Sequence, residues 1–154
     1  MCLMAWNWQP GADTPLLLLA NRDEFFDRPS QALHWWGGDT TGSVLAGQDL
    51  QAGGTWLGVS RSGKLAALTN VRQGLPPMAN APSRGELVAG FLHSNHDAFQ
   101  FLTDLSVRCA QYNPFNLLLW DGVQLLGLES RNARIQVMEP GSGAVSNAGF
   151  GTPW

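Results

Sequence analysis

The sequence predicts an α+β fold in which antiparallel β-sheet is layered with α-helices. Short apolar runs alternate with turns along the whole chain, and its 18 glycines and 9 prolines stand mostly between those runs. Two segments near the middle carry apolar residues at helical spacing. The length of 154 residues fits one domain with its own core, so we expect residues 1–154 to form a single domain.

The first predicted element is a hairpin of two strands, residues 2–8 and 15–20, joined by a polar turn. Centring the turn in the middle of the polar segment places Cys2 opposite Asn21 and beside the Arg22-Asp23 dipeptide. The hairpin therefore predicts that the N-terminal cysteine lies next to a cation and a carboxylate.

A second hairpin is predicted after a long polar region. Residues 22–54 are polar and rich in glycine, with one expected strand at residues 43–46. The second hairpin then covers residues 55–69, with its turn at Arg61-Ser62-Gly63. Its predicted register sets Asn70 opposite Thr55 at the open end. A proline-rich loop follows.

Two helices are predicted next. Ser83 and Glu86 have the spacing of a capping box and mark the start of the first helix. Its inward stripe is expected to hold Leu87, Val88, Phe91 and Leu92. Asn95 or Asp97 is expected to cap the second helix. Its inward stripe is expected to hold Phe99, Leu102, Leu105 and Cys109.

The C-terminal third is expected to return to strands. Three further strands are predicted at residues 117–120, 123–128 and 135–138, and the first two are joined by an Asp121-Gly122 hairpin turn. Residues 141–154 are expected to be irregular. This order of strands, helices and strands is typical of the α+β class.

Composition excludes several classes of protein. Lys and Arg number 9 against 12 Asp and Glu, a net charge of −3, so no nucleic-acid partner is expected. The longest aliphatic run, residues 16–19, is too short to span a bilayer, and no transmembrane segment is expected. No cation precedes the first apolar stretch, so no secretory signal is expected. Two cysteines do not make a disulfide framework, which favours a reducing, cytoplasmic compartment.

Cys2 is the first candidate for chemistry. Removal of the initiator methionine would leave an N-terminal cysteine, which carries a nucleophile and an α-amine base on one residue. Arg22 would favour the thiolate, and Asp23 would orient the amine or the guanidinium. Asn70 and Asn147 would donate hydrogen bonds to an oxyanion. The alternative is that Cys2 is only a small buried side chain.

A cluster of charged residues follows the second strand. Arg22 and Arg28 alternate with the acids at positions 23, 24 and 27. The cluster is either part of a functional site or a structural ion network, because charges that are partly buried need mutual pairing.

Several segments, taken in order, resemble the NRDE family, which is the transport and Golgi organisation protein 2 family. They are Met1-Cys2-Leu3, Asn21-Arg22-Asp23-Glu24, Gly53-Gly54-Thr55-Trp56-Leu57-Gly58, Leu68-Thr69-Asn70-Val71-Arg72, Ser146-Asn147 and Thr152-Pro153-Trp154. That family is similar to N-terminal nucleophile (Ntn) hydrolases of the cholylglycine-hydrolase kind. The resemblance implies an Ntn-hydrolase-like fold lacking its C-terminal part, so that the chain corresponds to the N-terminal portion of a longer pattern.

The resemblance also implies roles for individual residues. Cys2 would be the nucleophile, Asn21, Arg22 and Asp23 its polar and charged support, and Asn70 and Asn147 the oxyanion donors. A second implied role is the binding and intracellular trafficking of haem, or of a lipid or acyl-CoA. Two function classes thus stay open: a carrier of a bulky apolar ligand, or a cysteine hydrolase that cleaves a non-peptide amide.

For the carrier, seven tryptophans suit a pocket for a bulky apolar ligand, although aromatic residues also build cores. His34, next to Trp35 and Trp36, is the favoured histidine for haem, and Asn21 and Trp56 are further candidate ligand contacts. An ordinary loop histidine is the alternative. The other candidate iron ligands are Cys2, Cys109, His93 and His96, the two histidines lying at an exposed helix end. Nothing in the pattern requires a resident metal or cofactor, so haem enters only as a candidate ligand.

Overall fold

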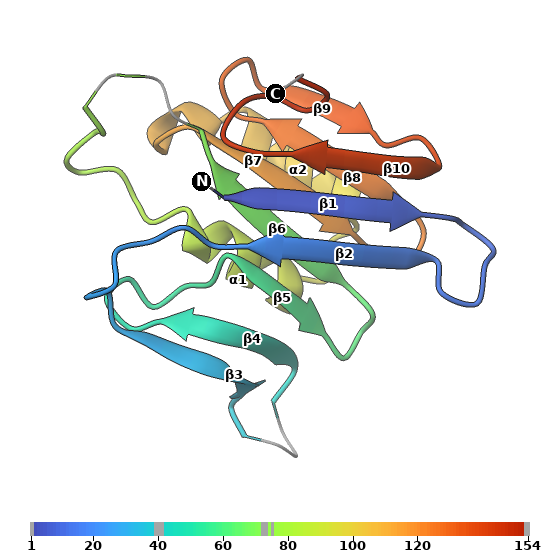
Figure 1. Cartoon of the computed structure of the whole chain (residues 1–154), viewed down its shortest axis with the longest axis horizontal. Helices are drawn as coiled ribbons and strands as arrows, with labels where there is room; N and C mark the ends of the chain where they lie inside the picture. Colours follow the sequence, from blue (N-terminus) through green and yellow to red (C-terminus); the bar gives the residue numbers. More distant parts are fainter. Residues whose placement is uncertain (1, 39–41, 72–73, 75, 153–154) are drawn as a thin grey trace.

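The chain folds into three layers: a small sheet, a large sheet and a pair of helices (Figure 1). This computed structural model describes residues 2–38, 42–71, 74 and 76–152. The elements are β1 (Leu3–Trp8), β2 (Leu16–Asn21), β3 (Ser30–Trp36), β4 (Val44–Asp49), β5 (Leu57–Ser60), β6 (Leu65–Asn70), α1 (Gly85–His93), α2 (Ala98–Ser106), the 3₁₀ turn η1 (Cys109–Gln111), β7 (Phe115–Trp120), β8 (Leu125–Glu129), β9 (Arg134–Val137) and β10 (Gly141–Val145).

Both sheets are antiparallel. The large sheet runs in chain order from β3 to β9, and the small sheet has the order β10-β1-β2. The predicted α+β class, with antiparallel sheet covered by helices, is confirmed. The pairing of β10 with β1 makes the N-terminal strand the central strand of the small sheet (Figure 1).

Two apolar cores hold the layers together, one on each face of the large sheet. Strand β6 contributes to both, because Ala66 and Leu68 face the helices while Ala67 faces the small sheet. The helix-side core includes Leu87, Val88, Phe91, Leu92, Leu102, Leu105, Leu117 and Leu119. The core between the sheets includes Met4, Trp6, Trp8, Leu118, Leu125, Met138 and Val145.

The first hairpin forms as predicted but its register differs by one residue. Leu3, rather than Cys2, lies opposite Asn21, and the Gln9 N–H donates to the carbonyl of Pro15 at 2.7 Å. The turn is thus centred one half-position later than the sequence suggested. Cys2 precedes the paired strand but stays at the same end of the hairpin, next to the residues that follow β2.

The second hairpin shows the same kind of shift. Leu57 pairs with Ala67, and the Ser60 N–H donates to Lys64 at 2.9 Å. The turn therefore has three residues and ends on Gly63, whose φ of +83° favours glycine. Asn70 consequently does not lie opposite Thr55, as the symmetric turn had predicted.

Two strands were not predicted. The region expected to be polar and irregular contains β3, an edge strand whose first four residues are exposed, and β4 extends beyond the strand expected at residues 43–46. The tail expected to be irregular contains β10. Gly143 in β10 lies directly beneath the indole of Trp6, so the absence of a side chain is what allows this strand to pack.

The helices lie close to the predicted positions, with three differences. Helix α1 has Arg84 as its N-cap residue, and the Glu86 carboxylate accepts from the Tyr112 hydroxyl at 2.6 Å, so the predicted capping box does not close. Phe99 is 56% exposed, because the buried phase of α2 starts at Ala98. Cys109 lies in η1 rather than in α2, yet it is buried as predicted. Within the described residues, neither helix is long and apolar enough to cross a membrane.

Candidate functional site

Cys2 lies at the end of the first hairpin, against the segment that leaves β2. The Asp23 backbone N–H donates to the Cys2 sulfur at 3.3 Å, and the thiol faces the Asp23 carbonyl at 3.8 Å. The Cys2 side chain is 8% exposed. The predicted closeness of Cys2 to the Arg22-Asp23 dipeptide is therefore present, in spite of the one-residue change of register.

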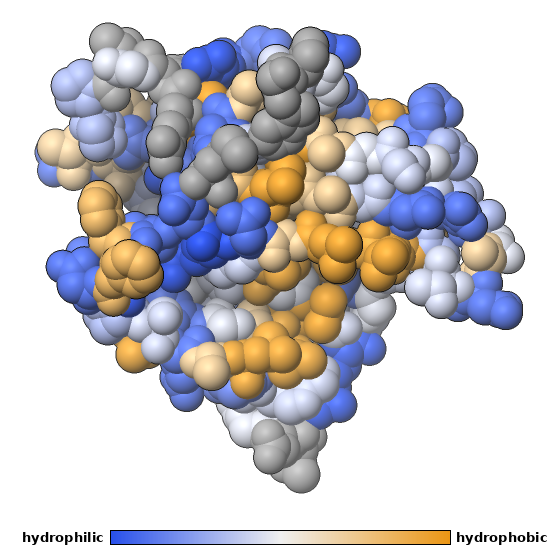
Figure 2. All heavy atoms as spheres, in the orientation of Figure 1, coloured by the Kyte–Doolittle hydropathy of each residue, from blue (hydrophilic) through white to orange (hydrophobic). Residues whose placement is uncertain are grey.

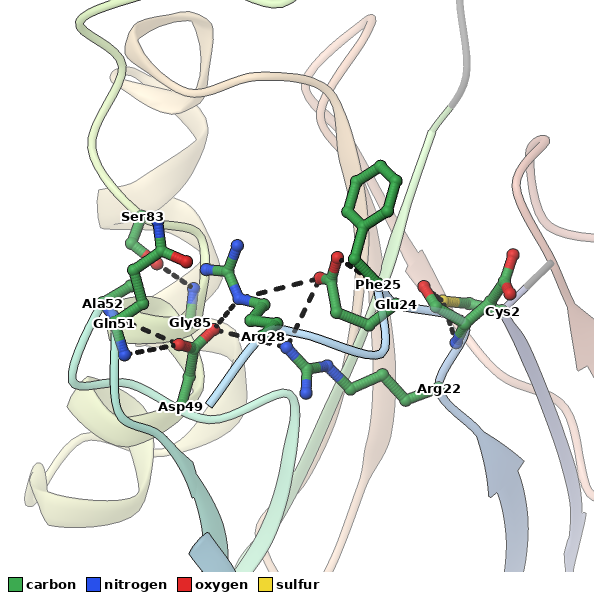
Figure 3. A network of polar contacts seen from close by, with 11 residues as sticks. Cys2, Arg22, Glu24, Phe25, Arg28, Asp49, Gln51, Ala52, Ser83 and Gly85 are labelled. Atoms are coloured by element: carbon green, nitrogen blue, oxygen red, sulfur yellow. Dashed lines mark hydrogen bonds and ion pairs between the residues drawn. The ribbon is translucent and has the colours of Figure 1, made fainter. Parts of the chain in front are cut away.

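A network of two arginines and two carboxylates lies beside Cys2 (Figure 3). Arg22 contacts Glu24 and Asp49, each at 3.3 Å. Arg28 donates to Asp49 at 2.7 Å and lies 3.8 Å from Glu24. Each arginine thus meets both carboxylates, and the four side chains are all partly buried.

Asp49 is the centre of this network. Burial alone would raise the pKa of Asp49, but the Arg28 hydrogen bond and the backbone N–H groups of Ala52 and Gln51 outweigh it. The net result is a pKa below the ordinary value for Asp. Asp49 therefore stays ionised at neutral pH and fixes the arginine side chains at the end of β4.

A cavity of about 370 Å³ opens over Cys2 and this network. The predicted site residues Cys2, Arg22, Asp23, Asn70 and Trp56 line it. Arg84, the N-cap residue of α1, also lines this cavity, although it is far from Cys2 in the sequence. A cavity of this size matches the lower part of the range for small-molecule sites, and its wall is rich in charge.

Asn147 lies behind Asn70. Its side-chain amide donates to the backbone carbonyl of Asn70 at 2.7 Å, and its own carbonyl oxygen is buried without a hydrogen-bond partner. Among the described residues, Asn147 is not part of the cavity wall, and neither is Asn21. The structure thus brings Cys2, Arg22, Asp23 and Asn70 to one cavity, and Asn147 contacts this group through Asn70.

His34, Trp35 and Trp36 do not join this cavity. They lie at the end of β3, on the edge of the large sheet, where the His34 ring is stacked with Trp36 and Arg61 lies over Trp35. Trp36 also approaches His93. These three candidate ligand residues therefore lie apart from the Cys2 cavity, at the end of β3 that leads away from Cys2.

Among the charged residues that line the cavity, sequence reasoning missed Asp49 and Arg84. Asp49 is the last residue of β4, beyond the strand predicted at residues 43–46, so nothing local indicated that its carboxylate would meet Arg22 and Arg28. Arg84 was interpreted only as part of a helix start. Both residues reach the cavity because segments that are distant in the sequence pack together, and no local sequence pattern predicts such packing.

The fold and this site define a layered α+β protein in which Cys2, just before β1, lies beside an arginine–carboxylate network. The chain belongs to the family described as Transport and Golgi organisation 2, which it matches over residues 1–154. It is 41% identical to the Transport and Golgi organization protein 2 homolog of Bos taurus and 38% identical to that of Homo sapiens, each over 100% of this chain. It is 33% identical to Transport and Golgi organization protein 2 of Drosophila melanogaster over 86% of this chain. The chain spans 59% of the length of the cattle and human relatives.

Proposed function

We propose that the chain binds and carries an amphipathic carboxylate within the cytoplasm, with haem as the first candidate cargo. The observation that supports this most is the cavity in which Cys2, a thiol, shares a wall with arginines. A carboxylate binds the arginines, and the thiolate is a chemically ordinary axial ligand for haem iron. A lipid or acyl-CoA carries a comparable combination of apolar body and anionic end.

The outer surface near the hairpin suits the apolar part of such a cargo. Leu17 and Leu19 of β2 are 54% and 66% exposed. Figure 2 shows apolar residues gathered over β1 and β2, beside a hydrophilic area at the end of the hairpin where β2 leads into Arg22 and Asp23. In this proposal the anionic end enters the cavity, and the apolar body lies on the exposed leucines.

A haem titration followed by the Soret band tests the carrier. We expect a saturable change for the wild-type chain, and weaker binding with an altered Soret position for Cys2→Ser. Cys109→Ser is the matched control, because Cys109 is buried against the carbonyls of Ser106 and Ser130. His34→Ala is expected to bind as the wild type does, because His34 lies outside the cavity. A linear response equal to that of an unrelated protein would contradict the proposal.

A cysteine hydrolase on an Ntn-hydrolase-like fold is the second candidate, favoured by Asn70 in the cavity wall and Asn147 behind it. The Cys2 thiolate would attack an amide carbonyl, and the amine would leave with a proton from the α-ammonium. Water would then release the acid and regenerate the thiol. This route requires loss of Met1, which lies outside the described residues, whereas the carrier does not require it. Intact mass together with amide turnover in wild type and Cys2→Ala separates the two candidates.

A further inference from the structure

Arg84 lines the Cys2 cavity but is not part of the arginine–carboxylate network. Arg22 and Arg28 share Glu24 and Asp49, which closes a group of two positive and two negative charges. None of the ion pairs between described residues includes Arg84. Its guanidinium donates through Nη1 to the carbonyl of Pro114 at 3.0 Å, a neutral acceptor.

The surroundings of Arg84 make an unmatched charge costly. Burial lowers the pKa of Arg84, the charges of Glu24 and Cys2 act in the opposite direction, and the charge of Arg28 adds to the lowering. Arg84 is therefore partly buried, and it lies within electrostatic reach of Cys2 and of Arg28, which line the same cavity. A buried charge is ordinarily paired, and a planar guanidinium pairs best with an oxyanion that accepts two parallel hydrogen bonds.

We propose that Arg84 is the anion-binding residue of the cavity and takes a carboxylate of the ligand while another part of that ligand meets Cys2. This rests on the proposed function in so far as the cavity binds a ligand, and it names the group that the cavity recognises. Among the described residues that line the cavity, Arg84 is the one arginine outside the network, and a single guanidinium matches a monoanion, which favours a carboxylate over a doubly charged phosphate. The start of α1 follows directly at Gly85 and adds a favourable dipole for an anion at this end of the cavity.

Alkylation of Cys2 tests this without knowledge of the cargo. Iodoacetate carries a carboxylate, and iodoacetamide is its neutral counterpart; both convert the thiolate to a thioether and release iodide. We expect Arg84→Gln to lower the ratio of the iodoacetate rate to the iodoacetamide rate at Cys2 by about tenfold, the effect of one unit charge several ångströms away near a protein surface. Arg84→Lys should retain most of the ratio, because it keeps the charge.

Arg134→Gln is the matched control, since Arg134 is an exposed arginine on β9, and it should leave the ratio unchanged. Mass spectrometry resolves Cys2 from Cys109. An unchanged ratio in a folded Arg84→Gln protein would overturn the proposal even if haem binds. A lowered ratio would support it even if the haem titration fails, so the two proposals fail separately.

A measurement on the wild-type chain covers the case in which Arg84→Gln does not fold or Cys2 reacts with neither reagent. The side-chain N–H signals of Arg84 are followed by nuclear magnetic resonance during addition of acetate or of inorganic phosphate. A saturable shift with acetate, stronger than with phosphate, supports a carboxylate site. A stronger response to phosphate would overturn the assignment of a carboxylate, and no response to either anion would overturn the proposal as a whole.

Discussion

At the scale of single residues, Asp49 determines the shape of the site. It accepts from Arg28 at 2.7 Å and from the backbone N–H groups of Gln51 and Ala52 at 3.0 and 3.1 Å, while Arg22 lies 3.3 Å away. One carboxylate therefore connects the loop after β4 to the segment after β2. Both arginines are partly buried, and a partly buried charge without a partner is costly. The Asp49 carboxylate therefore stabilises the fold chiefly by pairing with both guanidinium groups.

Replacement of Asp49 is expected to destabilise the chain in a pH-dependent way. Asp49→Asn should lower the free energy of unfolding at pH 7 by about 1–3 kcal/mol, because two arginines lose a charged partner. The folded-state pKa of Asp49 lies below 3.8, the ordinary value for an Asp side chain, so the contribution of Asp49 to stability is present above that pH and is lost as pH falls through the folded pKa.

Urea unfolding at pH 7 and at progressively lower pH measures this difference. The gap between wild type and Asp49→Asn should narrow once the pH falls below about 4. Asp13→Asn, an exposed carboxylate in the turn of the first hairpin, is the control and should show no such gap. A gap that stayed constant with pH would mean that the charge of Asp49 is not what stabilises the network.

At the scale of elements, the sequence predicted those whose periodicity is local. The stripe of Leu87, Phe91 and Leu92 identified α1, and the alternating apolar runs identified both hairpins. Hairpin registers were each wrong by one residue, because a turn of odd length and one of even length look alike in sequence. Strand β3 was missed because its first four residues are all exposed. They therefore lack the alternation of apolar and polar residues from which a strand is predicted.

Only the part of the candidate site that one hairpin brings together could be predicted from the sequence. The first hairpin brought Cys2 to Arg22 and Asp23, since that proximity survives a slip of one residue. Asp49 and Arg84 enter through strand and helix packing, and composition around them gives no signal. His34 illustrates the converse, because an adjacent tryptophan pair made it a ligand candidate although β3 carries it elsewhere.

Strand β10 provides the test at this scale. A Cβ at Gly143 would meet the indole of Trp6, which is 7% exposed and cannot move outward without opening the core between the sheets. Gly143→Ala should therefore cost about 1–3 kcal/mol of unfolding free energy, as overpacking does. Ser142→Ala, exposed on the same strand, should change stability little. Equal stability of the two variants in urea would show that β10 is not held against Trp6.

At the scale of the whole molecule, the small sheet has one covered and one open face. Leu16, Leu18 and Ala20 pack against the core between the sheets, whereas Leu17 and Leu19 point outward from the same strand. The open face continues toward the residues that line the Cys2 cavity (Figure 2). An apolar surface that ends at charged groups matches a ligand with the same division of polarity.

The double variant Leu17→Ser/Leu19→Ser tests whether this face takes part in binding. Because both side chains are more than half exposed, their loss should change the free energy of unfolding by no more than about 1 kcal/mol. Haem affinity should fall by about tenfold, the effect of losing apolar contact area over two leucines. Leu33→Ser, at 69% exposure on β3, is the control and should bind haem as the wild type does. Haem titrations and urea unfolding of the three proteins measure these effects. Equal haem affinities would confine the binding site to the cavity. A fall in affinity together with an equal fall in stability would mean that the loss of binding comes from a weakened fold.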